Sequence, residues 1–210
     1  MTLVGNAARR VAHALSAMHH SPDAVHLVKS AASRLEPHLA PADPAFLSAY
    51  GMLLLKGSIA AARLHQAVDV RDLQAEALSI AARLDTDRNE HWSAFGPTNV
   101  LVHRVSALAD MQSGGRVIEA ASEIPYGDLL RLPRERRASH LLDVGRGYLQ
   151  AGQRDAAACA LLDADQLARE EVRCRALTRQ VITDLVRSYP RGTSPPPALV
   201  QLARAVGVTV

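Results

Sequence analysis

The sequence predicts an all-α fold built from short helical hairpins that stack side by side. Three observations point to this class. Hydrophobic residues make up 48% of the chain and aromatic residues only 3%, with Ala and Leu prominent, which favours close-packed helices over a β-sandwich. Apolar residues recur at helical spacing, and no segment shows the two-residue period of a strand. Gly and Pro residues interrupt the helical segments at short intervals.

The clearest hairpin runs from residue 141 to residue 164. Small residues at 145 and 157 allow the two helices to approach closely, and large residues beside them fill the remaining space. The positions that carry this order are Leu141, Val144, Gly145, Tyr148, Ala157, Leu161 and Ala164. Gly152 can take the left-handed conformation that ends the first helix. This is the signature of the tetratricopeptide (TPR) repeat, a helix–turn–helix unit of about 34 residues. We therefore predict a TPR-like right-handed helical-hairpin solenoid of about eight to ten helices, because one such unit cannot bury its own apolar face.

The segment 6–35 fits the same pattern as a first hairpin. Ser21 and Pro22 are predicted to open its second helix as N-cap and first-turn proline. His19 stands where Gly152 stands in the later hairpin, so this turn departs from the pattern. The next helix, from Pro44, is apolar nearly all round, which predicts a buried, central position.

One further hairpin is expected before the hairpin at 141–164, and a tail is expected after it. Thr98 is predicted to cap a helix that runs to about residue 111. The segment 125–133 contains two prolines and a glycine and is interpreted as an irregular connection. A single amphipathic helix is expected over 170–189, and a short final helix over 198–205. We divide the chain into a TPR-like helical domain, residues 1–190, and a Pro-rich linker with a short C-terminal helix, residues 191–210.

The net charge of +3 and pI of about 9.2 make the chain mildly basic. Because no groove-reading motif accompanies this charge, we expect no direct DNA binding by this chain. Cys159 and Cys174 lack paired spacing and are predicted to be free and buried, which suits a reducing cytoplasm. We interpret no apolar run as long enough to span a membrane. Arg9, Arg10 and His13 interrupt any signal-peptide core. A cytoplasmic protein without membrane contact is the expectation.

Residues 92–100 form the least generic stretch, with the only tryptophan and one of two phenylalanines. Trp92 and Phe95 are predicted to pack the preceding loop onto the helices. Direct contact with a ligand is the alternative.

Three strings carry a resemblance to a known family: HWSAFGPTNVLVHR at 91–104, RERRASHLLDV at 134–144 and EEVRCR at 170–175. Together they resemble the C-terminal region of bacterial XRE-family helix-turn-helix transcriptional regulators with TPR-like sensor domains. The similarity covers nearly the whole chain. Such regulators usually carry a helix-turn-helix domain before the TPR region, whereas Met1 here leads almost directly into the first hairpin. The resemblance implies a sensor region without its helix-turn-helix DNA-binding domain. The chain would then be a shortened relative, a partner of a full-length regulator, or the product of a mis-called gene start.

Two polar helix faces are the candidate binding residues. Asn99, His103 and Asp110 share one face of the helix after Pro97, and Arg136, His140 and Asp143 share a face of the helix before Gly152, with Arg146 beside it. We hypothesise that these stripes face each other across a concave groove. There Asn99 would bind a peptide backbone and Arg146 a carboxylate. The alternative is that they are solvated helix faces with an Asp143–His140 or an Asp110–Arg contact.

The sequence therefore predicts a regulatory module that binds a peptide, a small ligand or a partner protein. A full-length regulator is one such partner protein. A scaffold or dimerisation module without a small ligand, such as a homodimer, is the alternative. No Gly-rich phosphate loop or nucleophile elbow is present, so an enzyme is not expected. His103 and His140 lack the spacing of an established metal site, and no metal or cofactor is expected.

Overall fold

The computed structural model describes residues 1–40, 43–84, 86–190 and 192–209. Across these ranges it contains twelve α-helices, two short 3-10 helices and no strand, apart from an isolated bridge between Arg88 and Phe95. The predicted all-α, TPR-like class is confirmed, and the expected count of eight to ten helices is too low. The chain divides into two compact units, Met1–Met111 and Gln112–Val210.

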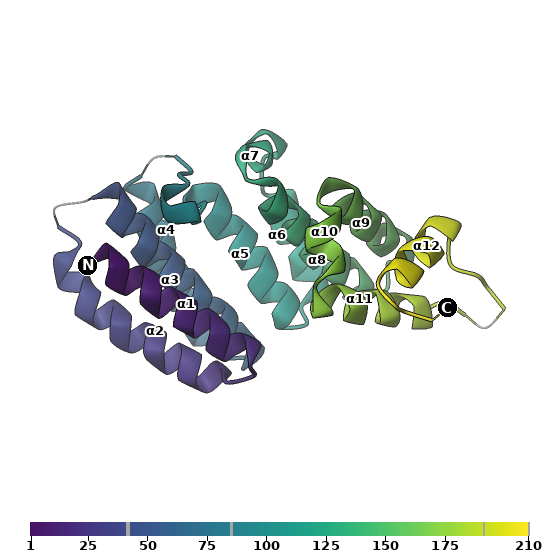
Figure 1. Cartoon of the computed structure of the whole chain (residues 1–210), viewed down its shortest axis with the longest axis horizontal. Coiled ribbons are helices and arrows are strands. Elements are labelled where there is room, and N and C mark those ends of the chain that lie inside the picture. The colour runs from purple at the N-terminus through teal and green to yellow at the C-terminus, as the bar shows by residue number, and fades with distance from the viewer. Residues whose placement is uncertain (41–42, 85, 191, 210) are drawn as a thin grey trace. The chain divides into compact units, whose positions relative to one another are not determined.

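The first unit holds five α-helices, which are labelled in Figure 1. They are α1 (Thr2–Ala17), α2 (Ser21–Leu35), α3 (Pro44–Arg63), α4 (Ala67–Ala82) and α5 (Pro97–Asp110), with 3-10 helices η1 (Glu36–His38) and η2 (Glu90–Trp92) between them. Helices α1, α2, α4 and α5 all contact α3. The central position predicted for this apolar helix is confirmed.

Helix α3 is long and apolar enough to cross a membrane by length and composition alone, so the sequence-based statement that no segment reaches that length was wrong. However, 83% of its apolar window is buried inside the protein. It therefore serves as the core helix of the first unit.

The second unit holds seven α-helices: α6 (Gly114–Ser122), α7 (Tyr126–Arg131), α8 (Arg134–Gln150), α9 (Arg154–Leu167), α10 (Arg169–Arg173), α11 (Ala176–Arg187) and α12 (Pro197–Ala205). Helices α8 and α9 form the hairpin predicted from the TPR signature. A Cβ atom on Gly145 would lie 3.1 Å from the Leu161 side chain, which confirms the close approach. The predicted final helix is also confirmed, and its buried residues Leu199 and Leu202 join the core of this unit.

Left-handed residues close the hairpin turns. Gly152 has φ +76° as predicted, and the same conformation is taken by His19 (φ +65°) and His65 (φ +55°). The departure noted at His19 is therefore one of residue type, because the backbone follows the pattern. Two of these three turns hold a side chain in a conformation that favours glycine.

Two segments differ from the sequence-based prediction. The expected irregular connection contains α7, and the expected single helix over 170–189 is broken between α10 and α11. Just before the break, the guanidinium of Arg173 donates two hydrogen bonds of 2.7 Å to the carboxylate of Asp165 in α9. Arg175 then takes an extended backbone (ψ +130°), from which α11 starts in a new direction.

Local predictions around individual side chains were also corrected. Helix α5 is capped by Asp87, whose Oδ1 accepts from the backbone N–H of Thr98 at 3.1 Å, so Thr98 itself is not the cap. His20, not Ser21, occupies the N-cap of α2. Cys159 and Cys174 are free, as predicted, but both are exposed. The predicted burial of these two thiols was therefore wrong.

The segment from η2 to the start of α5 holds two aromatic residues with different surroundings. Phe95 is fully buried in the core of the first unit, which confirms that it packs the loop onto the helices. Trp92 is 87% exposed, so its predicted packing role is wrong. His91, Trp92 and Ala94 all have positive φ, and this backbone turns the indole away from the core.

Candidate functional site

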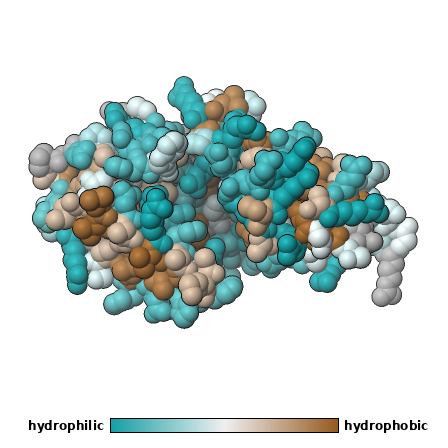
Figure 2. All heavy atoms as spheres, viewed as in Figure 1, coloured by the Kyte–Doolittle hydropathy of each residue, from teal (hydrophilic) through white to brown (hydrophobic). Residues whose placement is uncertain are grey.

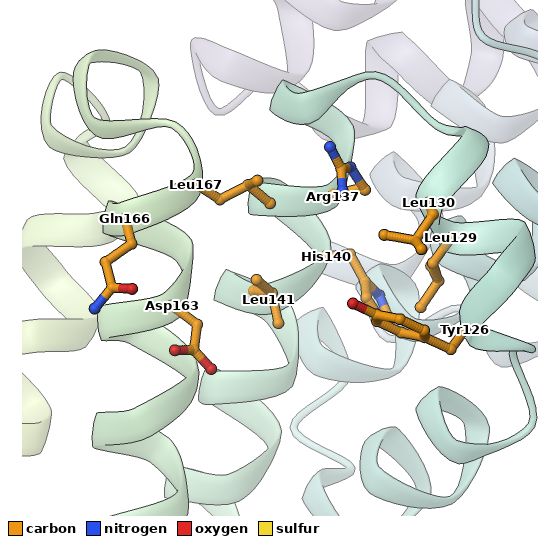
Figure 3. Close-up of a pocket in the computed structure, with 9 residues that line it drawn as sticks. All are labelled: Tyr126, Leu129, Leu130, Arg137, His140, Leu141, Asp163, Gln166 and Leu167. Atoms are coloured by element: carbon orange, nitrogen blue, oxygen red, sulfur yellow. The ribbon is translucent and has the colours of Figure 1, made fainter.

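The second unit contains a pocket of about 450 Å³ between α7, α8 and α9 (Figure 3). Its lining is Tyr126, Leu129, Leu130, Arg137, His140, Leu141, Asp163, Gln166 and Leu167. Figure 3 shows the α7 residues on one side, Asp163 and Gln166 of α9 on the other, and His140 and Leu141 of α8 between them. The pocket therefore has a largely apolar wall with polar groups at defined positions, as ligand pockets commonly have.

Local sequence explains how the three helices present these side chains. Pro125 has an extended backbone and precedes α7, and the helix then places Tyr126, Leu129 and Leu130 at i, i+3 and i+4, on one face. Pro133 likewise precedes α8. Tyr126 and Leu130 remain 73% and 48% exposed, so much of this apolar wall is open to a ligand.

Two nitrogen atoms of the pocket residues are buried without a hydrogen-bond partner. They are His140 Nδ1 and Arg137 Nε. His140 is only 5% exposed, and burial lowers the pKa of its imidazole to about 4, so the ring is neutral at neutral pH. Because buried polar atoms in native proteins are nearly always paired, these two nitrogens mark places beside the pocket where a ligand or an ordered water would supply a partner.

The chemistry available here is binding. The leucines and Tyr126 can contact an apolar side chain, Arg137 can donate to a carbonyl or carboxylate, and Gln166 can both donate and accept. Within the described ranges no group of three or more His, Cys, Asp or Glu residues could hold a metal ion.

The residues predicted from the polar stripe of α5 are in the first unit. Asn99 and His103 are 0% and 3% exposed. Asn99 Nδ2 lies 3.5 Å from Met52 Sδ, and His103 Nδ1 lies 2.9 Å from the carbonyl oxygen of Asn99. Asp110 accepts from Arg63 Nε at 3.3 Å, which is the Asp110–Arg contact given as an alternative.

The residues predicted from α8 lie in the second unit. Asp143 forms an ion pair of 2.9 Å with Arg146, and both side chains are about nine-tenths buried. This pairing replaces the suggested Asp143–His140 contact. Arg136 is half-buried. The solvated-face alternative is wrong for Asn99, His103, His140 and Asp143, which are all buried.

Of the seven predicted binding residues, His140 alone lines the described pocket of the second unit. Within each unit the structure brings together Asn99 with His103 and Asp143 with Arg146. The groove between the two stripes stays a prediction, because the stripes belong to different units. Sequence reasoning missed Tyr126, Leu129, Leu130 and Arg137. The available signal was the i, i+3, i+4 spacing after Pro125, which the interpretation as a loop concealed.

Comparison with known proteins supports the fold. No family model and no curated protein matches the chain. Among solved structures, the chain is similar to a crystal structure of a kinesin light chain from Podospora anserina. That structure consists of nearly identical TPR-like repeats. The TM-score is 0.57 at 17% identity, over 95% of this chain and 93% of that chain. A likeness at this identity shows the TPR-like fold.

Proposed function

We propose that this chain is a regulatory protein-interaction module that binds a peptide segment or a small ligand in the pocket between α7, α8 and α9. The observation that carries the proposal is the pair of orphaned nitrogen atoms, Arg137 Nε and His140 Nδ1, beside the exposed apolar residues of α7. An extended peptide supplies both an apolar side chain and a carbonyl oxygen, so it fits both features. The three strings that resemble XRE-family regulators support a regulatory role in a cytoplasmic protein, with a full-length regulator as one partner.

Selection of random peptides on the immobilised protein tests this function. Leu130→Asp places a charge on the exposed wall, and Leu78→Asp, at a similarly exposed leucine of α4 (48% for each), is the matched control. We expect peptides enriched on the wild-type protein to be lost by Leu130→Asp and kept by Leu78→Asp. Failure to enrich any peptide, or equal retention by both variants, would count against the proposal.

A second candidate function, self-association, is favoured by an exposed apolar stripe on α1. Val4, Val11 and Met18 are 54%, 51% and 67% exposed, and they recur every seven residues with exposed Ala7 and Ala14 between them. Figure 2 shows apolar side chains gathered along this helix. Such spacing is typical of a two-helix seam. Sedimentation of the wild-type protein and Val11→Glu tests it: a dimer that Val11→Glu dissociates supports self-association, and a wild-type monomer excludes it.

A further inference from the structure

The first unit contains a separate pocket of about 380 Å³ where η2 lies beside α1 and α3. It is lined by Arg9, Arg10, His13, Lys56, His91 and Trp92. None of these residues was assigned a binding role by the polar stripes, and the pocket shares no residue with the one in the second unit. Its composition is unusual, because five of six residues are basic and the sixth is the single tryptophan of the chain.

Positive charge is concentrated here at an energetic cost. Arg9 is half-buried and its Nε is buried without a hydrogen-bond partner. Burial, followed by repulsion from Arg10, lowers the pKa of Arg9. Among the described residues that line the pocket there is no carboxylate. Arginines gathered in a pocket whose lining holds no anion favour an anionic ligand, because guanidinium groups bind carboxylate or phosphate through paired hydrogen bonds.

Trp92 is held at the edge of this pocket by an unusual backbone. His91, Trp92 and Ala94 have φ of +50°, +58° and +49°, a conformation that is strained for side chains other than glycine and clusters at binding sites. The loop is fixed on both sides of the indole, since Asn89 Oδ1 accepts from the Ala94 N–H at 3.0 Å and Phe95 is buried. The exposed indole offers an apolar face for a ligand group next to the cations.

We propose that this pocket binds an acidic peptide segment, whose carboxylates bind Arg9 and Arg10 and whose apolar side chain packs on Trp92. Single-stranded nucleic acid fits less well. It needs several aromatic platforms along a continuous basic track, and this pocket has one aromatic residue within a bounded volume. The inference rests on the proposed function in taking the occupant to be a peptide, but it uses a different site.

The test uses the fluorescence of the full chain, because its single tryptophan lies in the site. The probes are a short peptide of glutamates around one leucine, the same peptide with glutamine for every glutamate, and oligothymidylate. The variants are Arg9→Gln and the exposed Arg10→Gln, with Arg71→Gln as the control, an exposed arginine of α4 outside the pocket. Circular dichroism checks that each variant folds. If Arg9→Gln does not fold, Arg10→Gln still decides the test.

We expect the glutamate peptide to change the Trp92 emission saturably and the glutamine peptide to have no effect. Affinity should fall about tenfold in either pocket variant, since one charge-assisted contact is lost, and stay unchanged in Arg71→Gln and Leu130→Asp. No response to the glutamate peptide, equal loss in Arg71→Gln, or tighter binding of oligothymidylate would overturn the inference. Peptides still selected through the second-unit pocket in that case would leave the proposed function standing, so the two failures are distinguishable.

Discussion

A Cβ atom on Gly51 would lie 1.9 Å from Cζ of Phe95, so the phenyl ring occupies the space that any other residue at position 51 would fill. Gly51 is buried near the middle of α3, and Phe95 precedes α5. This contact fixes the 91–95 loop against the central helix of the first unit.

Gly51→Ala is therefore expected to destabilise the protein by about 3 kcal/mol, at the upper end of the cost of overpacking a core. Chemical denaturation measures the effect. Gly115→Ala is the control, because its Cβ would meet nothing within 4 Å and alanine is the better helix former. The explanation fails if both substitutions have the same effect.

Asp87 joins the same loop to α5, since its Oδ1 accepts from the N–H of Thr98 at 3.1 Å and of Asn99 at 3.4 Å. Asp87→Ala should cost about 1 kcal/mol of unfolding free energy, the usual value of a helix cap. Thr98→Val, which removes the hydroxyl but keeps the backbone donor and the shape of the side chain, is the control and should be nearly neutral. A larger loss in Thr98→Val than in Asp87→Ala would restore Thr98 as the cap.

The hairpin turns predict stability changes of opposite sign. Gly152→Ala should destabilise by about 1 kcal/mol, because its φ of +76° is unfavourable for alanine while its Cβ would contact nothing within 4 Å. His65→Gly should stabilise by a smaller amount, since glycine relieves the strain at φ +55° but gains entropy in the unfolded chain. Thermal unfolding of both variants measures this. Destabilisation of similar size in both would show that backbone strain does not control the stability of these turns.

The neutral state of His140 makes stability depend on pH. Its pKa is about 4 in the folded protein against about 6.5 in an unfolded chain, so below pH 6.5 the unfolded state takes up the proton first. Stability is then lost as the pH falls from about 6.5 to about 4, by up to about 3 kcal/mol. His140→Gln should reduce this loss, whereas His20→Gln, at an exposed histidine, should not. Unfolding curves over this pH range measure the stability of both variants. Identical dependence of stability on pH in the two variants would contradict the role given to His140.

Much of the fold could be predicted because the residues that determine a TPR-like hairpin lie close together in the sequence. Gly145, Leu161 and Gly152 sit in one short segment, and the close contact and the turn that they predict both appear in the structure. The burial of α3 followed from its apolar composition alone. Left-handed turns at His19 and His65 were less visible, because no glycine marks them.

The candidate site was harder to predict because it depends on contacts between helices that are distant in sequence. The pocket combines Tyr126, His140 and Gln166 from three helices, and no spacing rule connects them. Prolines at 125 and 133 indicated a loop, although each instead precedes a helix. The ion pair of Asp165 with Arg173, which lies next to the break between α10 and α11, is also a contact that helical periodicity does not report.

Amide hydrogen exchange of the protein with and without a selected peptide tests the central claim most directly. The account predicts slower exchange in α7, in residues 137–141 of α8 and in residues 163–167 of α9, and no protection in Leu130→Asp at the same peptide concentration. Protection confined to other helices, or identical protection in Leu130→Asp, would contradict binding in the pocket between α7, α8 and α9.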